Sequence, residues 1–355
     1  MLKTTRFTAL ALAAGTAAAV IGTTVPTSAA SAAPALSACT GTECSFDVPP
    51  GTYEVTVTLG SQSAAADTGL DVEARRTVLA PVATSAGEFE QYSVTVNVRT
   101  PESMPDGQEG PGTPGLQVYL TGKAPALASI KVTPRPHTPQ LSIISDSTAA
   151  DWLNGPKRGW GQEFPQYFRQ AMSVANYADS GSSTVGWLSN PALFATVRAL
   201  IQPGDEVLIQ LAHNDKTTPE ATYRANLHTL VDGVRSQGGK PVLVTPPVRH
   251  LFDADGTISP TGRIVNNLGV DLPAVMRQVA TEERIPLLDL TADSAALLEK
   301  LGPAASWPLY VGAASSPADA THFTPYGATV ISGLVARELT AAHLPAAAFL
   351  RHAGD

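Results

Sequence analysis

The sequence predicts an α/β protein in which a doubly wound parallel sheet follows a smaller all-β sandwich. Two observations predict this order. Up to residue 135, short runs of β-branched residues alternate apolar and polar side chains, whereas beyond residue 140 short apolar runs alternate with helical stretches. The first pattern is typical of antiparallel strands with one buried face, and the second of parallel strands covered by helices on both faces. We therefore expect a β-sandwich domain over residues 33–135 and an α/β domain over residues 136–355.

The strands and helices behind this prediction are short and well separated. In the β region the alternating runs are 53–59, 92–98, 116–120 and 130–132. In the α/β region the apolar runs are 141–144, 172–175, 206–211, 241–244 and 285–290, and the helical stretches include 190–201, 218–236, 271–283 and 325–342. The segment TPRPHTPQ at 133–140 joins the two regions as a stiff, proline-rich linker.

The first 32 residues have the layout of a secretory signal peptide. Lys3 and Arg6 precede a 14-residue stretch made mostly of Ala, Leu, Val, Thr and Gly, and small residues occupy the positions before Ala33. This apolar stretch is short for a helix that crosses a bilayer, which favours a cleaved signal peptide. The alternative to cleavage is that the stretch is retained as an anchor helix. No later segment holds 18 uninterrupted apolar residues. We therefore expect a secreted, extracellular protein.

The charge of the chain argues against polyanionic partners. Cleavage before Ala33 changes the formal net charge from −8 to −10, because 21 of the 23 basic residues then stand against 31 acidic ones. A negative protein is repelled by nucleic acid and by anionic membranes. We expect neither as a partner, and we expect a monomer.

The cysteines indicate a disulfide. Cys39 and Cys44 are the two cysteines of the sequence, and an even count in an exported protein favours a bond that closes a small loop. A single Cys-x4-Cys pair is a poor zinc signature.

Polar motifs follow the predicted strands of the α/β region. Asp146-Ser147-Thr148 follows the first, NYADSGSS at 176–183 the second, and LAHND at 211–215 the third, while DATHFTPYGA lies at 319–328. Ligands of doubly wound sheets bind at the carboxyl ends of the strands. These motifs are therefore expected at one edge of the sheet.

Together the motifs resemble those of the SGNH, or GDSL, hydrolase superfamily and, more narrowly, of the rhamnogalacturonan acetylesterase family. The matching residues are Ser147; Asn176, Ala178, Gly181 and Ser183; His213, Asn214 and Asp215; and Asp319, His322, Phe323 and Thr324. The resemblance covers most of residues 140–342 and implies a flavodoxin-like sheet and a secreted esterase that removes acetyl groups from plant cell-wall polysaccharide. The β region resembles the galactose-binding-like module often fused to such esterases.

The residue types suit this chemistry. A serine hydroxyl is a weak nucleophile and needs a base, which His322 can supply because the pKa of histidine lies near neutrality. Asp319 can accept a hydrogen bond from the other ring nitrogen and stabilise the imidazolium. The resemblance implies an oxyanion hole made by the backbone N–H groups of Ser147 and Gly181 and the side-chain amide of Asn214. It implies no cofactor and no metal.

Each of these residues also suits a structural role. Ser147 follows a strand at the expected start of a helix, where it can act as an N-cap, and Asp319 can cap the helix that follows it. Asn214 and Asp215 are typical of turns. We interpret His213 as a packing or hydrogen-bonding residue. Tryptophans near the motifs can stack on sugars or anchor loops; they are Trp152, Trp160 and Trp187. The remaining histidines are interpreted as surface residues; they are His137, His228, His250, His343 and His352.

Three positions depart from the pattern of the family. Ser145 and Ala212 stand where the family has glycine, and Ser182 stands where arginine is common. Serine and alanine resist positive φ, so the first two changes are expected to shift the oxyanion site if that geometry is needed.

Two other functions compete with a polysaccharide acetylesterase. One is a lipase or broad-specificity esterase on acyl lipids, although the Gly-x-Ser-x-Gly elbow of α/β-hydrolase lipases is absent from the sequence. The other is a non-catalytic carbohydrate-binding surface protein. Because every candidate catalytic residue lies beyond residue 140, we expect the α/β region alone to hydrolyse small soluble esters.

Overall fold

The computed structural model describes residues 36–102, 110, 112–313, 316 and 318–351. The predicted signal peptide at residues 1–32 lies outside these ranges. Residues 32–355 group into one compact unit, and the domain boundary at residue 135 stays a prediction.

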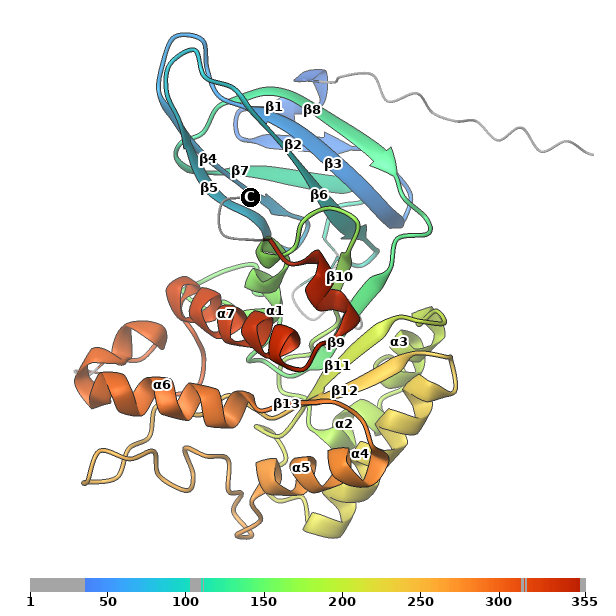
Figure 1. Cartoon of the computed structure of the whole chain (residues 1–355), viewed down its shortest axis with the longest axis vertical. Coiled ribbons are helices and arrows are strands. Elements are labelled where there is room, and N and C mark those ends of the chain that lie inside the picture. The colour runs from blue at the N-terminus through green and yellow to red at the C-terminus, as the bar shows by residue number, and fades with distance from the viewer. Residues whose placement is uncertain (1–35, 103–109, 111, 314–315, 317, 352–355) are drawn as a thin grey trace, which may run out of the picture. The chain divides into compact units, whose positions relative to one another are not determined.

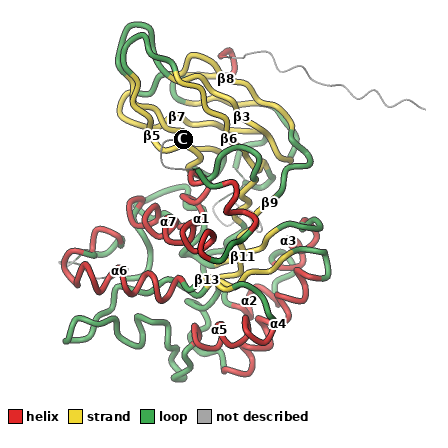
Figure 2. The backbone as a smooth tube through the Cα atoms, viewed as in Figure 1, coloured by secondary structure: helices red, strands yellow, loops and turns green. Residues whose placement is uncertain are grey.

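The N-terminal region consists of two antiparallel sheets (Figure 2). One has the order β1-β2-β7-β4-β5 and the other β6-β3-β8. Apolar side chains from both sheets form one shared core, which explains the period-two pattern of the sequence. The strands are β1 (Cys39–Thr40), β2 (Glu43–Phe46), β3 (Gly51–Leu59), β4 (Ala66–Val72), β5 (Arg76–Thr84), β6 (Glu90–Val98), β7 (Leu116–Ala124) and β8 (Leu127–Pro134).

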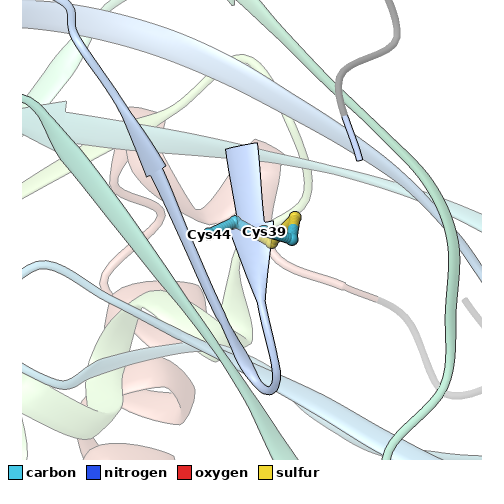
Figure 3. The surroundings of a disulfide bond; sticks show 2 residues. All are labelled: Cys39 and Cys44. Carbon is cyan, nitrogen blue, oxygen red and sulfur yellow. A yellow bond between two sulfur atoms is a disulfide. The ribbon is translucent and has the colours of Figure 1, made fainter. Parts of the chain in front are cut away.

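A disulfide joins the first two strands. Cys39 of β1 lies opposite Cys44 of β2 in the antiparallel ladder, and their sulfur atoms are bonded (Figure 3). This confirms the pairing predicted from the cysteine count.

The C-terminal region is built on a five-stranded parallel sheet, as predicted. Its order is β10-β9-β11-β12-β13, which in chain order is the 2-1-3-4-5 arrangement of flavodoxin-like folds. The strands are β9 (Gln140–Ser145), β10 (Ser173–Asn176), β11 (Glu206–Gln210), β12 (Lys240–Val244) and β13 (Leu287–Leu288).

Helices cover both faces of this sheet (Figure 1). One face packs against α1, α6 and α7 around the fully buried Trp160, and the other against α2 to α5 around Trp187. Within the described ranges, no helix is long and apolar enough to span a membrane. The helices are α1 (Trp160–Glu163), α2 (Thr184–Ser189), α3 (Phe194–Leu200), α4 (Glu220–Arg235), α5 (Leu272–Glu283), α6 (Leu290–Ala305) and α7 (Pro325–Ala341).

The structure differs from the predicted elements in several places. Strands β1, β2, β4 and β5 are absent from the prediction. Strand β4 is buried on both faces at most of its positions, including the polar Thr68 and Asp71, so its sequence does not alternate. The expected strand at 285–290 is short, because Asp289 accepts a hydrogen bond from the backbone N–H of Ala292 and starts α6 there.

The central strand β11 is expected to be the most sensitive part of this sheet. Leu208 is fully buried in it, so Leu208→Ala should lower the free energy of unfolding by about 2–5 kcal/mol through lost burial and a residual cavity. Leu268 is 55% exposed, and Leu268→Ala should change stability by no more than about 0.5 kcal/mol. Urea denaturation of both variants measures the difference, and equal effects would contradict the burial of β11.

Candidate active site

Ser147 lies in a turn directly after β9, and no helix begins there. The carboxylate of Asp146 accepts hydrogen bonds from the backbone N–H of Thr148 at 3.0 Å and from its hydroxyl at 2.7 Å. The backbone oxygen of Asp146 accepts from Ala149. Asp146 therefore makes the hydrogen bonds that close this turn, and the hydroxyl of Ser147 is left for another partner.

That partner is His322. Its Nε2 lies 3.0 Å from Ser147 Oγ, and its Nδ1 lies 2.9 Å from both carboxylate oxygens of Asp319. A carboxylate can only accept, so Nδ1 carries a proton and the lone pair of Nε2 faces the serine hydroxyl. Asp319 does not cap α7, because Thr324 does so by accepting from Gly327. The structure thus brings together the three residues predicted as nucleophile, base and orienting acid.

Burial of the ring is the main factor that favours the neutral form of His322. Burial lowers the pKa of His322 below its ordinary value; Asp319 acts against this, and the charge of Lys157 adds to the lowering. Burial raises the pKa of Asp319, but hydrogen bonds from His322 and its charge outweigh burial, so this pKa lies below its ordinary value. Lys157 Nζ is 3.4 Å from Asp319 Oδ2.

Trp152 anchors the nucleophile turn. Its Nε1 donates to the backbone oxygen of Ser147 at 3.1 Å, and its ring meets the His322 ring edge-on with centroids 5.7 Å apart. Trp160 and Trp187 are fully buried, so these two tryptophans anchor the interior and are not placed to stack on a sugar.

Candidate donors for an oxyanion are present at all three predicted positions. Gly181 has a φ of +86°, and no atom lies within 4 Å of the place where a Cβ would be, so this backbone borders open space. Asn214 Nδ2 donates to the backbone oxygen of Ser182 at 3.2 Å, which uses one of its two hydrogens. In the described part of the chain, no hydrogen bond engages the backbone N–H of Ser147 or of Gly181.

Other motif residues hold the loops. Asp215 accepts from the backbone N–H of Thr184 at 3.0 Å and from the hydroxyls of Thr184 and Thr218. Ser183 caps α2 by accepting from Gly186. These contacts tie the end of β11 to the loop that carries Gly181.

Gln210 is a site residue that sequence reasoning missed. It is fully buried at the end of β11, its Nε2 lies 3.4 Å from Asp146 Oδ2, and its Oε1 accepts from Trp160 Nε1 at 2.9 Å. His213, interpreted as a hydrogen-bonding residue, also contacts this carboxylate, with Nδ1 3.3 Å from Asp146 Oδ2. The available signal was a glutamine directly after the apolar residues 207–209 of β11.

The three departures from the family pattern introduce no backbone strain. Ser145, Ala212 and Ser182 are absent from the described residues that have positive φ. Ser145 Oγ donates to Gln210 Oε1 at 3.1 Å, and Ser182 donates to Asp179. The backbone conformation at Ser145 and Ala212 therefore gives no reason for the oxyanion site to shift.

The prediction for His250 was wrong. This residue is 5% exposed, its ring stacks on Trp307 with centroids 3.7 Å apart, and its Nε2 lies 2.8 Å from Ser306 Oγ. His352 lies outside the described residues.

A serine, a neutral histidine and an aspartate hydrogen-bonded in series at the carboxyl edge of a parallel sheet define a serine hydrolase site. The model of the GDSL-like lipase/acylhydrolase family matches residues 146–330. Rhamnogalacturonan acetylesterase RhgT of Bacillus subtilis (strain 168) is 34% identical over 220 residues, which cover 58% of this chain and 91% of that protein. The uncharacterized esterase YxiM of the same strain is 29% identical over 311 residues, covering 82% of this chain and 72% of that protein.

One solved structure agrees with the fold. The crystal structure of protein YxiM from Bacillus subtilis superposes with a TM-score of 0.54 at 24% identity and covers 87% of this chain and 84% of that chain. The protein belongs to the GDSL-like lipase/acylhydrolase family. It is a carboxylic ester hydrolase.

Lys157 should tune the pH dependence of activity. Its charge lowers the pKa of His322, and only the neutral imidazole can accept the proton of the serine. In the wild-type protein, kcat/KM should therefore rise with pH through a pKa below 6.5. Lys157→Met should move this acid limb to higher pH, and Lys157→Arg should leave it in place. The pH profile of p-nitrophenyl acetate hydrolysis measures both, and an unmoved limb in Lys157→Met would contradict the electrostatic role.

Proposed function

We propose that Ser147, His322 and Asp319 hydrolyse acetyl esters on a plant cell-wall polysaccharide of the rhamnogalacturonan or pectin type. The observation that carries this proposal is the continuous set of hydrogen bonds from Ser147 Oγ through the imidazole to the carboxylate of Asp319.

In the proposed reaction, Ser147 Oγ attacks the carbonyl carbon of the ester while His322 Nε2 takes the hydroxyl proton. The tetrahedral intermediate collapses when His322 returns this proton to the sugar oxygen, which leaves as the alcohol. Water then attacks the acetyl-serine with the same histidine as base, and acetate departs with Ser147 restored. Asp319 holds the Nδ1 proton throughout and stabilises the imidazolium in both steps.

The charge that develops on the carbonyl oxygen needs donors. The backbone N–H groups of Ser147 and Gly181 and the amide of Asn214 are proposed for this role. Their availability in the structure supports it, because two are unused and the third has a second hydrogen. Such donors stabilise the transition state more than the bound ester.

Two observations support an acidic polysaccharide as the substrate. Relatives in Bacillus subtilis are called rhamnogalacturonan acetylesterases. Lys216 and Arg249 line a hollow of about 70 Å³ next to His213. Arg249 Nη2 donates to the backbone oxygen of His213 at 3.0 Å, whereas Lys216 is exposed, so the charge of Lys216 is proposed to meet the carboxylate of a uronic acid.

Secretion is part of the proposal. It rests on the signal-peptide pattern of the first 32 residues, and the disulfide between Cys39 and Cys44 fits an oxidising compartment.

The first test removes the proposed nucleophile and one oxyanion donor. Ser147→Ala should abolish hydrolysis of p-nitrophenyl acetate without unfolding the protein, because it deletes a single hydroxyl. Asn214→Ala should lower kcat by roughly 10²- to 10³-fold with little change in KM. Ser189→Ala, at an exposed position of α2, is the control and should match the wild type. A folded Ser147→Ala variant with wild-type turnover would exclude the mechanism.

The second test concerns the substrate. Acetate release from acetylated rhamnogalacturonan should exceed release from acetylated xylan, and kcat/KM on p-nitrophenyl esters should fall as the acyl chain grows beyond acetate. A rise toward octanoate would favour the lipase alternative, since each additional buried CH₂ contributes about 0.8 kcal/mol in an apolar acyl groove.

Within the same test, Lys216→Met should raise KM for the acidic polymer by about two- to fivefold at low salt, the range of an exposed ion pair. KM for p-nitrophenyl acetate should not change. Lys300→Met, which removes an exposed lysine of α6, serves as the matched control. Equal KM values for both variants on the acidic polymer would remove Lys216 from substrate binding.

A further inference from the structure

The turn between β4 and β5 lies against the chain that follows the proposed nucleophile. Its residue Ala74 is fully buried, and its backbone oxygen accepts a hydrogen bond from Gln162 Nε2 at 2.8 Å. The same Nε2 donates to the backbone oxygen of Trp152 at 3.0 Å, and Gln162 Oε1 accepts from the backbone N–H of Trp152. Trp152 in turn donates to the backbone oxygen of Ser147. A continuous set of hydrogen bonds therefore runs from the β region to the nucleophile turn.

A second connection reaches the segment of His322. Arg158 Nη1 donates to the backbone oxygen of Arg75 in the same turn at 2.9 Å. The backbone N–H of Arg158 donates to the backbone oxygen of Phe323 at 3.0 Å. Through Gln162 and Arg158, the β4–β5 turn is thus linked to Trp152, near the proposed nucleophile, and to Phe323, next to the proposed base.

Two buried arginines of the β region meet a carboxylate four positions after Ser147. Arg76 Nη1 lies 3.1 Å and Arg99 Nη2 lies 3.3 Å from the same oxygen, Asp151 Oδ2. The three side chains are 2%, 7% and 4% exposed, so these ion pairs are shielded from water. Ion pairs at such burial are strongly coupled, and removing one partner leaves an uncompensated charge.

The other oxygen of this carboxylate reaches the second loop of the site. Asp151 Oδ1 accepts from Asn176 Nδ2 at 2.7 Å, and the same nitrogen donates to the backbone oxygen of Ala149 at 2.7 Å. Arg99 also donates to the backbone oxygen of Asn176. Asn176 ends β10, and the loop after it carries Gly181. Asp151 therefore joins the nucleophile turn to the loop with a proposed oxyanion donor.

Arg99 keeps its charge at neutral pH although it is buried. Burial and the neighbouring charge of Arg76 lower the pKa of Arg99 to about 10, while Asp151 acts against this. Arg99 therefore remains a cation under the conditions of an assay.

We propose that Arg76 and Arg99 are positioning residues of the esterase: their ion pairs with Asp151 hold the Ser147 turn and the Gly181 loop in register. This inference rests on the proposed function of those loops and adds the β region to the site. This positioning role does not require the β region to bind carbohydrate.

These contacts also change an expectation drawn from the sequence. The α/β region alone was expected to hydrolyse small esters, but without the β region Asp151 loses both cations and Gln162 loses Ala74. The structure therefore predicts that the β region is needed even for a substrate as small as p-nitrophenyl acetate.

The test uses the full-length enzyme. The double variant Arg76→Met/Arg99→Met should lower kcat for p-nitrophenyl acetate by about 10- to 100-fold, the range for a small displacement of catalytic groups, with KM within about twofold of the wild type. The variant Arg76→Lys/Arg99→Lys, which keeps both charges, should retain most of the wild-type kcat. Arg135→Met removes an exposed ion pair of the same region with Glu54 and should match the wild type. The rate of labelling of Ser147 by a fluorophosphonate should fall in parallel with kcat.

Folding is checked by near-ultraviolet circular dichroism and by the temperature of unfolding. A folded double variant with kcat equal to that of Arg135→Met overturns the positioning role. If the double variant does not fold, the isosteric Asp151→Asn decides: reduced kcat at unchanged KM supports the role, and wild-type kcat overturns it. A wild-type enzyme that neither hydrolyses the ester nor reacts with the fluorophosphonate overturns the proposed function itself, so the two failures are distinct.

Discussion

The candidate site is organised around one buried carboxylate, that of Asp146. A carboxylate that is buried away from solvent needs several hydrogen-bond donors. For Asp146 they are Thr148 on the same turn and Gln210 and His213 at the end of β11. Although burial raises the pKa of Asp146, His213 and Thr148 outweigh it and bring this pKa below its ordinary value. Because its partners lie on two adjacent strands, satisfying this charge aligns the two strand ends. The turn geometry that results directs Ser147 toward the imidazole.

The buried carboxylate of Asp151 also aligns separate segments by accepting from several donors. Its donors come from both regions of the chain. Arg76 and Arg99 belong to the β region, and Asn176 belongs to the parallel sheet. Breaking a buried pair on one side typically destabilises a protein by about 3–5 kcal/mol, since the other charge stays buried and unpaired. The two regions are therefore joined by ion pairs that are shielded from water.

Sequence reasoning succeeded where local patterns report directly on structure. Parallel strands are apolar and end at one edge, so the motifs around Ser147 and His322 could be assigned to the same place. It failed where a contact decides the environment of a residue. Nothing in the sequence separates the buried Arg76 from the exposed Arg135, and the aromatic partner that buries His250 lies far along the chain. Strand β4 was missed for the same reason, because burial on both faces removed its alternation.

The long sequence separation of the site contacts has a consequence for the order of folding. Ser147 and His322 are 175 positions apart, and Gln162 and its acceptor Ala74 are 88 apart. Closing such long loops is entropically expensive, so contacts of this kind form late. During synthesis the β region is made first. At that stage Arg76 lacks its partner Asp151, which lies later in the sequence. Esterase activity consequently requires the segment of Asp319 and His322 to have docked beside Ser147, so a chain in which this contact has not formed does not hydrolyse esters.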